Sequence, residues 1–347
     1  MAGRRFSTTD YLNTRCAEME PLFAFEARDE AEAKLWRVKA LAKLRDLLGE
    51  MPEPVPLEAE IVETVDMGSY VREKVIFDAD ALSSVPGYML IPKKLSSPGP
   101  ALLCLHGHGP GKDPVVGITT PRGGLSQEAM EGVIRRSNYD YARQFAERGY
   151  VTFTFDFRCF GERVDASPDI YGRDPCNVHF IRGALIGTNL LSLDIADTQR
   201  AVDYLLTRPE VGHNRIGCVG LSFGATMTMW AAATDKRIHA ACMSCYLNEF
   251  EAYAVRMANF CGSQFVPALR RYFDISDIAS LIAPKPLLIE SGARDEGFPI
   301  ESAKRAFERL SEAYRAWGHP EHLAKDVFDG GHQFSGAKAF DFFDKWL

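Results

Sequence analysis

The stretch Arg215-Ile-Gly-Cys-Val-Gly-Leu-Ser222-Phe-Gly224 decides the fold. Its apolar run Ile216–Val219 predicts a short strand, and a helical pattern of small residues follows the serine. Gly220 and Gly224 flank Ser222 at the apex of a sharp turn, where a Cβ at either position would crowd the backbone. A strand, a tight turn and a helix with a serine at the apex form a nucleophile elbow. The stretch therefore predicts that Ser222 attacks acyl carbonyl groups.

Strand and helix patterns alternate from about residue 100 to the end of the chain. Apolar strand-like runs occur at 101–105, 150–155, 216–219, 238–244, 286–290 and 322–328. Helical patterns occur at 141–148, 190–206, 222–233, 301–317 and 337–347. This alternation predicts an α/β fold with a mostly parallel central sheet of about eight strands and helices on both faces. Earlier runs at 58–65, 70–77 and 87–92 lack helical spacers, so they predict antiparallel strands at one sheet edge.

The first part of the chain is different in character. Residues 30–49 show helical periodicity closed by Gly49, and together with residues 8–28 they predict a helical N-terminal extension. A proline-rich break follows at 51–56. We therefore expect residues 1–57 to form the extension and residues 58–347 to form the catalytic domain. Irregular insertions near 157–188 and 246–284 are expected to shape the ligand crevice beyond the strand carboxyl ends.

Composition excludes several classes of protein. The 347 residues are 46% hydrophobic and 25% charged, as in an ordinary globular protein, and the net charge of −7 argues against a nucleic-acid partner. The N-terminus has no apolar region typical of a secretory signal, and no apolar stretch is long enough to span a bilayer. The eight cysteines are expected to be buried thiols rather than disulfides. We therefore expect a cytoplasmic protein without a membrane partner.

The helical extension also raises a hypothesis about assembly. Its apolar face, from Leu41 to Leu48, must be buried somewhere. It could cover the active site or mediate self-association, so a homo-oligomer is one hypothesis.

A nucleophilic serine needs a base and an acid that orients the base, and in an elbow of this kind they follow the serine as acid and then histidine. The acid candidate is Asp295, in a glycine-rich turn after the strand at 286–290, and the adjacent Glu296 is an alternative. The base candidate is His332, in Asp-Gly-Gly-His after the last strand. His179, inside the first insertion, could also face the substrate. Both main candidates follow strand carboxyl ends, so they belong to the same sheet edge as Ser222.

The oxyanion formed during acyl transfer needs preorganised backbone N–H donors. One is expected from Phe223, directly after the serine. The other is expected from the loop Leu105-His-Gly-His-Gly109, with the N–H of His108 as our choice and those of Gly107 and Gly109 as alternatives. The spacing of His106 and His108 could suggest a metal, as could Cys242-Met-Ser-Cys245, but neither has the further ligands of a metal site. We therefore predict no metal and no cofactor.

The charged segment at 156–163 also follows a strand carboxyl end. Its charges could line the pocket, or they could form a buried ion-pair network that supports the loop.

Over about residues 58–347 the chain resembles the α/β-hydrolase superfamily, and within it the bacterial acetyl-xylan-esterase-like and dienelactone-hydrolase-like group. The segments that carry the resemblance are 102–112, 155–163, 197–224, 235–241, 283–299 and 329–334. The resemblance implies that Ser222 is the nucleophile, Asp295 the orienting acid and His332 the base. One departure is Ala225, where many relatives have a further glycine.

We therefore expect a serine hydrolase that cleaves a small-molecule carboxylic ester through an acyl-enzyme intermediate. One alternative is a serine exopeptidase or amidase resembling the catalytic domain of prolyl-oligopeptidase-like enzymes, although only about 57 residues precede the core here. A catalytically inactive binding protein is a third interpretation, which the Ser222, Asp295 and His332 set disfavours.

Overall fold

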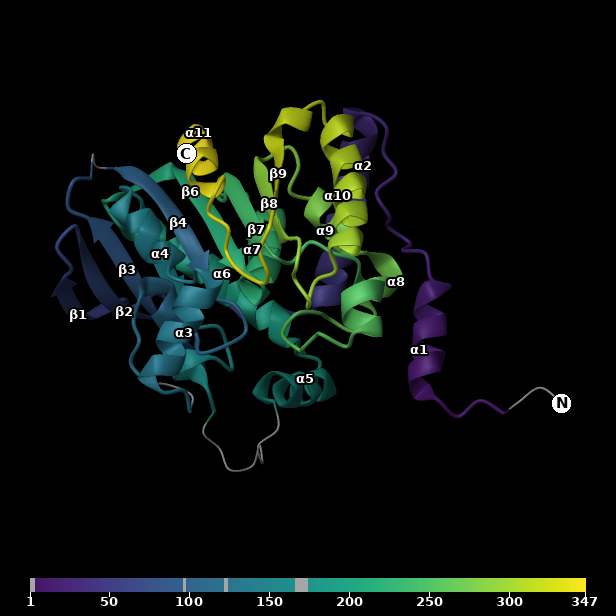
Figure 1. Cartoon of the computed structure of the whole chain (residues 1–347), viewed down its shortest axis with the longest axis horizontal. Coiled ribbons are helices and arrows are strands. Elements are labelled where there is room, and N and C mark those ends of the chain that lie inside the picture. Colours follow the sequence, from purple (N-terminus) through teal and green to yellow (C-terminus); the bar gives the residue numbers. More distant parts are fainter. Residues whose placement is uncertain (1–3, 96–97, 122–123, 166–173) are drawn as a thin grey trace.

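The computed structural model describes residues 4–95, 98–121, 124–165 and 174–347. Its centre is a nine-stranded sheet in the order β1-β2-β3-β5-β4-β6-β7-β8-β9 (Figure 1). The strands are β1 (Glu60–Asp66), β2 (Tyr70–Asp80), β3 (Ser83–Pro92), β4 (Gly99–Leu105), β5 (Val151–Phe155), β6 (Val211–Leu221), β7 (Ala240–Ser244), β8 (Leu287–Gly292) and β9 (Leu323–Phe328).

Two kinds of strand pairing divide the sheet. The pairs β1–β2, β2–β3 and β3–β5 are antiparallel, whereas β5–β4 and all pairs from β4 to β9 are parallel. This confirms the predicted antiparallel start and parallel remainder, with nine strands where the sequence predicts about eight. Parallel strands share the direction of their carboxyl ends, so the loops after β4, β6, β8 and β9 emerge at one sheet edge.

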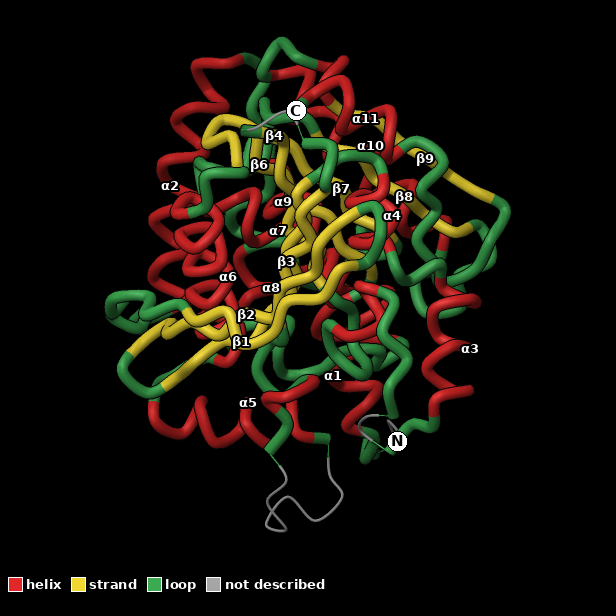
Figure 2. Tube along the Cα trace, turned by 90° about the vertical axis from the view of Figure 1, so that its left-hand side faces the viewer, coloured by secondary structure: helices red, strands yellow, loops and turns green. Residues whose placement is uncertain are grey.

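Helices cover both faces of the sheet, as Figure 2 shows with α2 and α6 on one side and α3 and α11 on the other. The α-helices are α1 (Thr8–Ala17), α2 (Glu30–Leu48), α3 (Gln127–Ser137), α4 (Tyr141–Glu147), α5 (Pro175–Ile186), α6 (Leu190–Thr207), α7 (Phe223–Thr234), α8 (Leu269–Tyr272), α9 (Ile275–Ser280), α10 (Ile300–Ala316) and α11 (Ala339–Trp346). Short helical turns are η1 (Asp113–Val116), η2 (Gly161–Arg163), η4 (Phe250–Arg256) and η5 (Pro320–His322).

The central strands are buried on both faces, which explains their continuous apolar sequences. In β4, Leu103 and Leu105 pack into the hydrophobic core that α2, α6, α7 and α10 cover. The intervening Leu102 and Cys104 pack into the second core, under α4 and α11. Successive side chains of a strand point to opposite faces, so a strand between two helical layers needs an apolar residue at every position.

The predicted N-terminal helices are present as α1 and α2. The Asp29 carboxylate caps the start of α2 by accepting a hydrogen bond from the Glu32 N–H (2.9 Å), and the predicted Gly49 ends the helix at φ 74°. Leu44 and Leu48 are buried in the first core. Part of the apolar face that the sequence left without a partner is therefore buried within the chain itself.

The two insertions contain more helix than the sequence predicts. The part of 157–188 that the structure describes holds η2 and α5, and residues 166–173 lie outside the described residues. The segment 246–284 holds η4, α8 and α9. The helix α3 is also absent from the sequence prediction. Several of these helices are short, so their periodicity is weak, but Asp174 and Pro175 are a cap signal that could have revealed α5.

The structure bears on the predictions about membrane-spanning segments and about the cysteines. Among the described residues, none of the helices combines the length and the apolarity that crossing a membrane requires. All eight cysteines are buried and free of disulfides, in agreement with the sequence prediction.

The elbow helix α7 lies very close to the sheet at Gly224. A Cβ on this residue would overlap the backbone carbonyl of Leu105, at the end of β4. A Cβ on Gly220 would in turn overlap the backbone of Gly224. The start of α7 therefore lies against β4 and β6 at a distance that only glycine permits.

Replacing Gly224 with alanine should destabilise the protein by about 2 kcal/mol or more, because backbone atoms cannot move aside as a flexible side chain can. Urea unfolding followed by circular dichroism measures this change. Gly109→Ala is the matched control, since a Cβ there has no atom within 4 Å. An unfolding free energy for Gly224→Ala equal to that of the control would contradict the close packing of α7 on β4.

Candidate active site

Ser222 lies between β6 and α7 in a strained backbone conformation, with φ 62° and ψ −122°. Positive φ is uncommon for a residue with a side chain, and it costs free energy unless the surroundings impose it. Here the Ser222 N–H donates a hydrogen bond to the carbonyl of Ser244, at the end of β7 (3.0 Å). Thr226 and Ala225 donate their N–H groups to the Ser222 carbonyl. The serine is thus held at the apex of the predicted turn.

Asp295 and His332 form a hydrogen-bonded pair across the loops that follow β8 and β9. The distance from His332 Nδ1 to Asp295 Oδ2 is 2.7 Å. The carboxylate is buried, and its other oxygen accepts hydrogen bonds from the N–H groups of Gly297 (2.9 Å) and Phe298 (3.2 Å). Because an ionised carboxylate only accepts, Nδ1 carries the proton and Nε2 is left as the basic nitrogen.

The ring of His332 is positioned by a residue that sequence reasoning missed. Phe298 stacks on the imidazole with ring centroids 5.3 Å apart and an interplanar angle of 8°. The turn that supplies this ring also supplies the Asp295 carboxylate. Glu296, the sequence alternative for the acid, is exposed and makes no contact with His332 among the described interactions. The pairing is therefore between His332 and Asp295.

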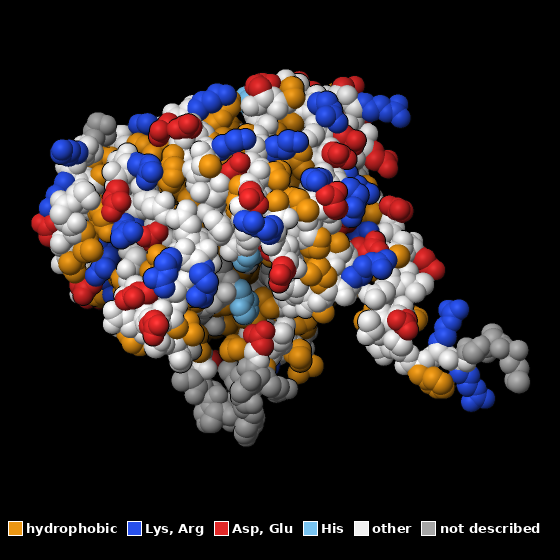
Figure 3. Space-filling model, in the orientation of Figure 1, with side chains coloured by type: hydrophobic (Ala, Val, Ile, Leu, Met, Phe, Trp, Pro, Cys, Tyr) orange, Lys and Arg blue, Asp and Glu red, His pale blue; other side chains and the backbone are white. Residues whose placement is uncertain are grey.

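Five of the predicted site residues line one cavity with a volume of about 640 Å³. They are Ser222, Phe223, Asp295, His332 and His108. Histidine side chains are visible in a hollow near the middle of the face that Figure 3 shows. In the described part of the chain Ser222 Oγ has no hydrogen bond to His332. Such bonds often tighten only when substrate binds.

The loop after β4 distinguishes among the three candidates for the second oxyanion donor. The Gly107 N–H donates a hydrogen bond to Tyr139 Oη (2.5 Å), so it is already engaged. Gly107 and Gly109 do not line the cavity, whereas His108 does. Tyr139 is buried, and burial raises the pKa of its hydroxyl well above the usual value. Of the three residues, only His108 lines the cavity, and the Tyr139 hydroxyl holds the loop through a contact that no sequence motif indicates.

His106 contributes to the structure of this loop rather than to a ligand site. Its Nδ1 lies 2.8 Å from the Gly107 carbonyl, and its Nε2 lies 3.0 Å from the Phe157 N–H. Since a carbonyl accepts and an N–H donates, Nδ1 carries the proton and Nε2 accepts. Burial lowers the pKa of His106 to about 4. Both ring nitrogens are occupied, so a metal shared by His106 and His108 does not fit.

The remaining candidates from the sequence, His179 and the Cys242–Cys245 pair, lie outside the cavity. His179 pairs with Asp165 (3.3 Å) and does not line the cavity. Cys242 is buried in β7, and the Cys245 thiol donates to the Gln333 carbonyl (3.4 Å). These two cysteines are core residues.

The charged segment 156–163, after β5, forms a buried ion-pair network, which was one of the two roles that the sequence allowed for it. The buried Lys112 ammonium lies 2.6 Å from the Asp156 carboxylate, whose other oxygen accepts the Lys112 N–H (2.8 Å). Arg158 and Arg163 both contact the buried carboxylate of Asp197. The Lys112–Asp156 contacts join the loop after β4 to the loop after β5, and the contacts to Asp197 join the latter loop to α6. None of these residues lines the cavity, so the network supports the loops from outside it.

The chain is similar in sequence and in fold to known proteins. The chain is 28% identical to "Putative hydrolase YtaP" of Bacillus subtilis (strain 168) over 317 residues, which are 90% of this chain and 100% of the relative. Its fold is similar to that of a "putative acetyl xylan esterase" from Bacteroides fragilis NCTC 9343, with a TM-score of 0.78, 20% identity, and coverage of 94% of this chain and 83% of the other.

A second solved structure with the same fold is the glucuronoyl esterase from Solibacter usitatus. The TM-score is 0.67 at 15% identity, with coverage of 94% of this chain and 98% of the other. The sequence model of the Abhydrolase family matches residues 1–334 of this chain. With the elbow at Ser222 and the fold around it, this match over nearly the whole length means that the chain belongs to the Abhydrolase family.

Proposed function

We propose that the protein is a serine hydrolase that cleaves carboxylic esters through an acyl-enzyme intermediate on Ser222. The observation that carries the proposal is the single cavity that Ser222 shares with the hydrogen-bonded pair His332 and Asp295. The strained serine, the buried acid and the half-exposed imidazole are the parts that acyl transfer requires. The names of the structural relatives, which are esterases, support an ester as the substrate.

The reaction follows from the protonation states of the pair. His332 Nε2 removes the proton of Ser222 Oγ as the oxygen attacks the ester carbonyl carbon. Asp295 holds the Nδ1–H and stabilises the imidazolium that forms. When the tetrahedral intermediate collapses, Nε2 returns the proton to the departing alkoxide. Nε2 then deprotonates water as the water oxygen attacks the acyl-enzyme carbonyl carbon. When this second intermediate collapses, the bond to Ser222 Oγ breaks and Nε2 returns the proton to Oγ, which releases the carboxylic acid and free Ser222.

Two backbone donors stabilise the negative oxygen of each tetrahedral intermediate. The Phe223 N–H follows the nucleophile at the start of α7, where the helix dipole also favours negative charge. The His108 N–H lies in the loop after β4, next to Gly107. A Cβ added to Gly107 would lie 3.3 Å from Ser222 Cβ, so this part of the loop is close to the nucleophile. Each step uses groups of this chain and water.

The side chains of the cavity wall favour a polar substrate. Asp174, Asn259, Gln264 and Arg294 contribute polar side chains to the lining. The similarity to acetyl xylan and glucuronoyl esterases makes esters of carbohydrates the first substrates to test. A panel of acetylated xylan, methyl glucuronate and p-nitrophenyl esters of increasing acyl length would rank the acyl and alcohol preferences.

Replacing Ser222 with alanine should lower kcat for p-nitrophenyl acetate by on the order of 10³-fold or more, since the acyl-enzyme cannot form. Initial rates measured by release of p-nitrophenolate check this. Ser291→Ala, which changes a serine at the end of β8 outside the cavity lining, should keep wild-type turnover.

Turnover retained by Ser222→Ala, with a native circular dichroism spectrum, would sink the assignment. Labelling by a fluorophosphonate probe should occur in the wild type and be absent in this variant. Faster cleavage of aminoacyl anilides than of esters would instead indicate a peptidase.

Asp295→Asn should lower kcat by on the order of 10³–10⁴-fold, because an amide does not fix the Nδ1–H tautomer of His332. Glu296→Gln removes the adjacent, exposed carboxylate and should leave kcat within about twofold. Steady-state kinetics of both variants on one ester gives the comparison. Equal losses of kcat in the two variants would show that Asp295 is not the sole acid that orients His332.

Tyr139→Phe should lower kcat about 10-fold or more, because the Gly107 N–H loses its acceptor and the loop carrying His108 is no longer held. The control is Tyr150→Phe, which removes a hydroxyl that donates a hydrogen bond to Asp344. Neither Tyr150 nor Asp344 lines the cavity. Unfolding free energies of the two variants separate a catalytic effect from a general one. Unchanged kcat in Tyr139→Phe would mean that other contacts hold the loop.

A further inference from the structure

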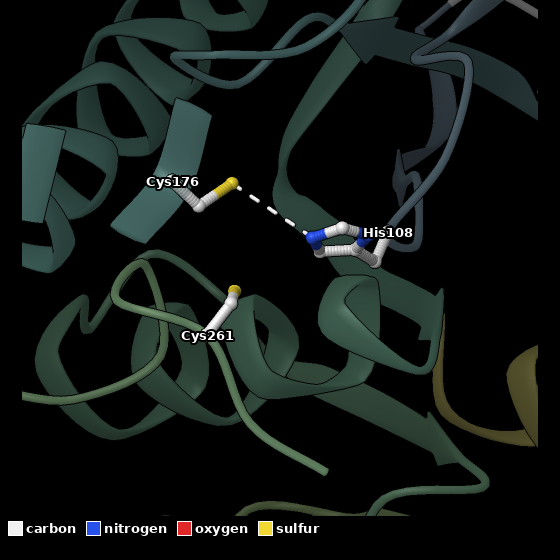
Figure 4. Close-up of side chains that lie close together, drawn as sticks. All are labelled: His108, Cys176 and Cys261. Atoms are coloured by element: carbon white, nitrogen blue, oxygen red, sulfur yellow. Dashed lines mark hydrogen bonds between the residues drawn. The ribbon is translucent and has the colours of Figure 1, made fainter. Parts of the chain in front are cut away.

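Three side chains with metal-binding atoms meet beside the cavity that contains Ser222. They are His108 in the loop after β4, Cys176 in the first turn of α5, and Cys261 between η4 and α8. Their ligand atoms all lie within 4.8 Å of one another. Figure 4 shows the two thiols and the imidazole pointing toward one another, with His108 Nε2 3.8 Å from Cys176 Sγ.

These separations suit a tetrahedral ion. A Zn²⁺ ion bound at about 2.3 Å from sulfur and about 2.0–2.1 Å from nitrogen holds the two donor atoms about 3.6 Å apart. The His108–Cys176 distance of 3.8 Å is close to that value. The other donor separations are at most 4.8 Å, so they exceed the tetrahedral value by about 1 Å or less.

The positions of both cysteines are set by packing between α5 and the segment around Gly262. The Gly262 N–H donates a hydrogen bond to Asn177 Oδ1 (2.9 Å), next to Cys176. A Cβ on Gly262 would lie 2.8 Å from the Cys176 carbonyl. Gln264 accepts the Cys261 N–H (3.2 Å) and donates to Thr226 of α7 (3.1 Å). The site is therefore preorganised by contacts that do not involve the thiols.

The donor set selects a class of ion. Two thiolates and one imidazole are soft or borderline ligands, which favour Zn²⁺ and similar ions over Mg²⁺ and Ca²⁺. Cys176 and Cys261 are 1% and 5% exposed, so their thiols are shielded from bulk water on most sides. His108 and Cys261 also line the cavity, so a fourth position is within reach of water or a bound molecule.

We propose that His108, Cys176 and Cys261 form a binding site for a thiophilic divalent ion, Zn²⁺ foremost. The ion ties α5 and the segment after η4 to the loop that carries His108. This assignment differs from the sequence analysis, which predicts no metal and considers His108 only with His106. It goes beyond the proposed esterase function and does not depend on it.

The test is direct metal binding by the full chain. The protein is reduced with a phosphine, freed of metal with a chelator and titrated with Co²⁺, whose thiolate charge-transfer band reports sulfur ligation. One equivalent should bind, and Zn²⁺ should displace it. Cys176→Ala and Cys261→Ala should each weaken binding by more than the roughly 10–100-fold that loss of an outer partner costs. Cys16→Ala, which removes a buried thiol from α1, should bind as the wild type does.

The outcomes separate this proposal from its competitors. Absence of a thiolate–cobalt band in the reduced wild type, or a band that persists in both cysteine variants, would overturn it. So would a Cys176–Cys261 disulfide peptide in protein that takes up no metal, which would indicate a redox pair instead. If a cysteine variant fails to fold, His108→Gln provides the same test, because that side chain is exposed. Ser222→Ala should bind metal normally, so failure of the esterase proposal and failure of the metal proposal are distinguishable.

Discussion

The contact between the start of α7 and the ends of β4 and β6 is the constraint on which the rest of the site depends. Gly224 lies against the Leu105 carbonyl, and Gly220 lies against Gly224, with no space for a Cβ at either residue. This packing holds Ser222 at a positive φ that the residue would not adopt alone. The buried layers on both sheet faces supply the free energy that maintains the strain.

The remaining groups reach Ser222 because loops from neighbouring strands are held by buried polar contacts. The loop after β4 is bound by Tyr139 on one side and by the Lys112–Asp156 pair on the other. The turn after β8 folds its own N–H groups onto Asp295. A loop fixed in this manner presents a side chain or an N–H with little loss of entropy when substrate binds, which is the condition for preorganised catalysis.

Much of the fold and the central residues of the candidate site could be predicted from the sequence. Ser222 was recognisable because the glycines around it are adjacent in the chain. Asp295 and His332 were recognisable because each follows an apolar run that ends at the same sheet edge. Tyr139 and Phe298 could not be found in this way, since their roles depend on contacts with residues distant in the chain or on ring orientation. The helices α3 and α5 escaped prediction because each buries few residues, Met130 and Gly132 in α3 and Cys176 in α5, so little hydrophobic pattern marks them.

The sequence by itself determined the alternation of strand and helix, the sheet edge at which the functional loops gather, and the order of serine, acid and histidine. These follow from local propensity, hydrophobic period and the shared direction of parallel strands. Only the tertiary structure decided which acid contacts His332, which N–H of the 105–109 loop is already engaged, and which cysteines meet His108. Those choices depend on distances of a few ångströms between segments far apart in the chain, and no local pattern encodes such distances.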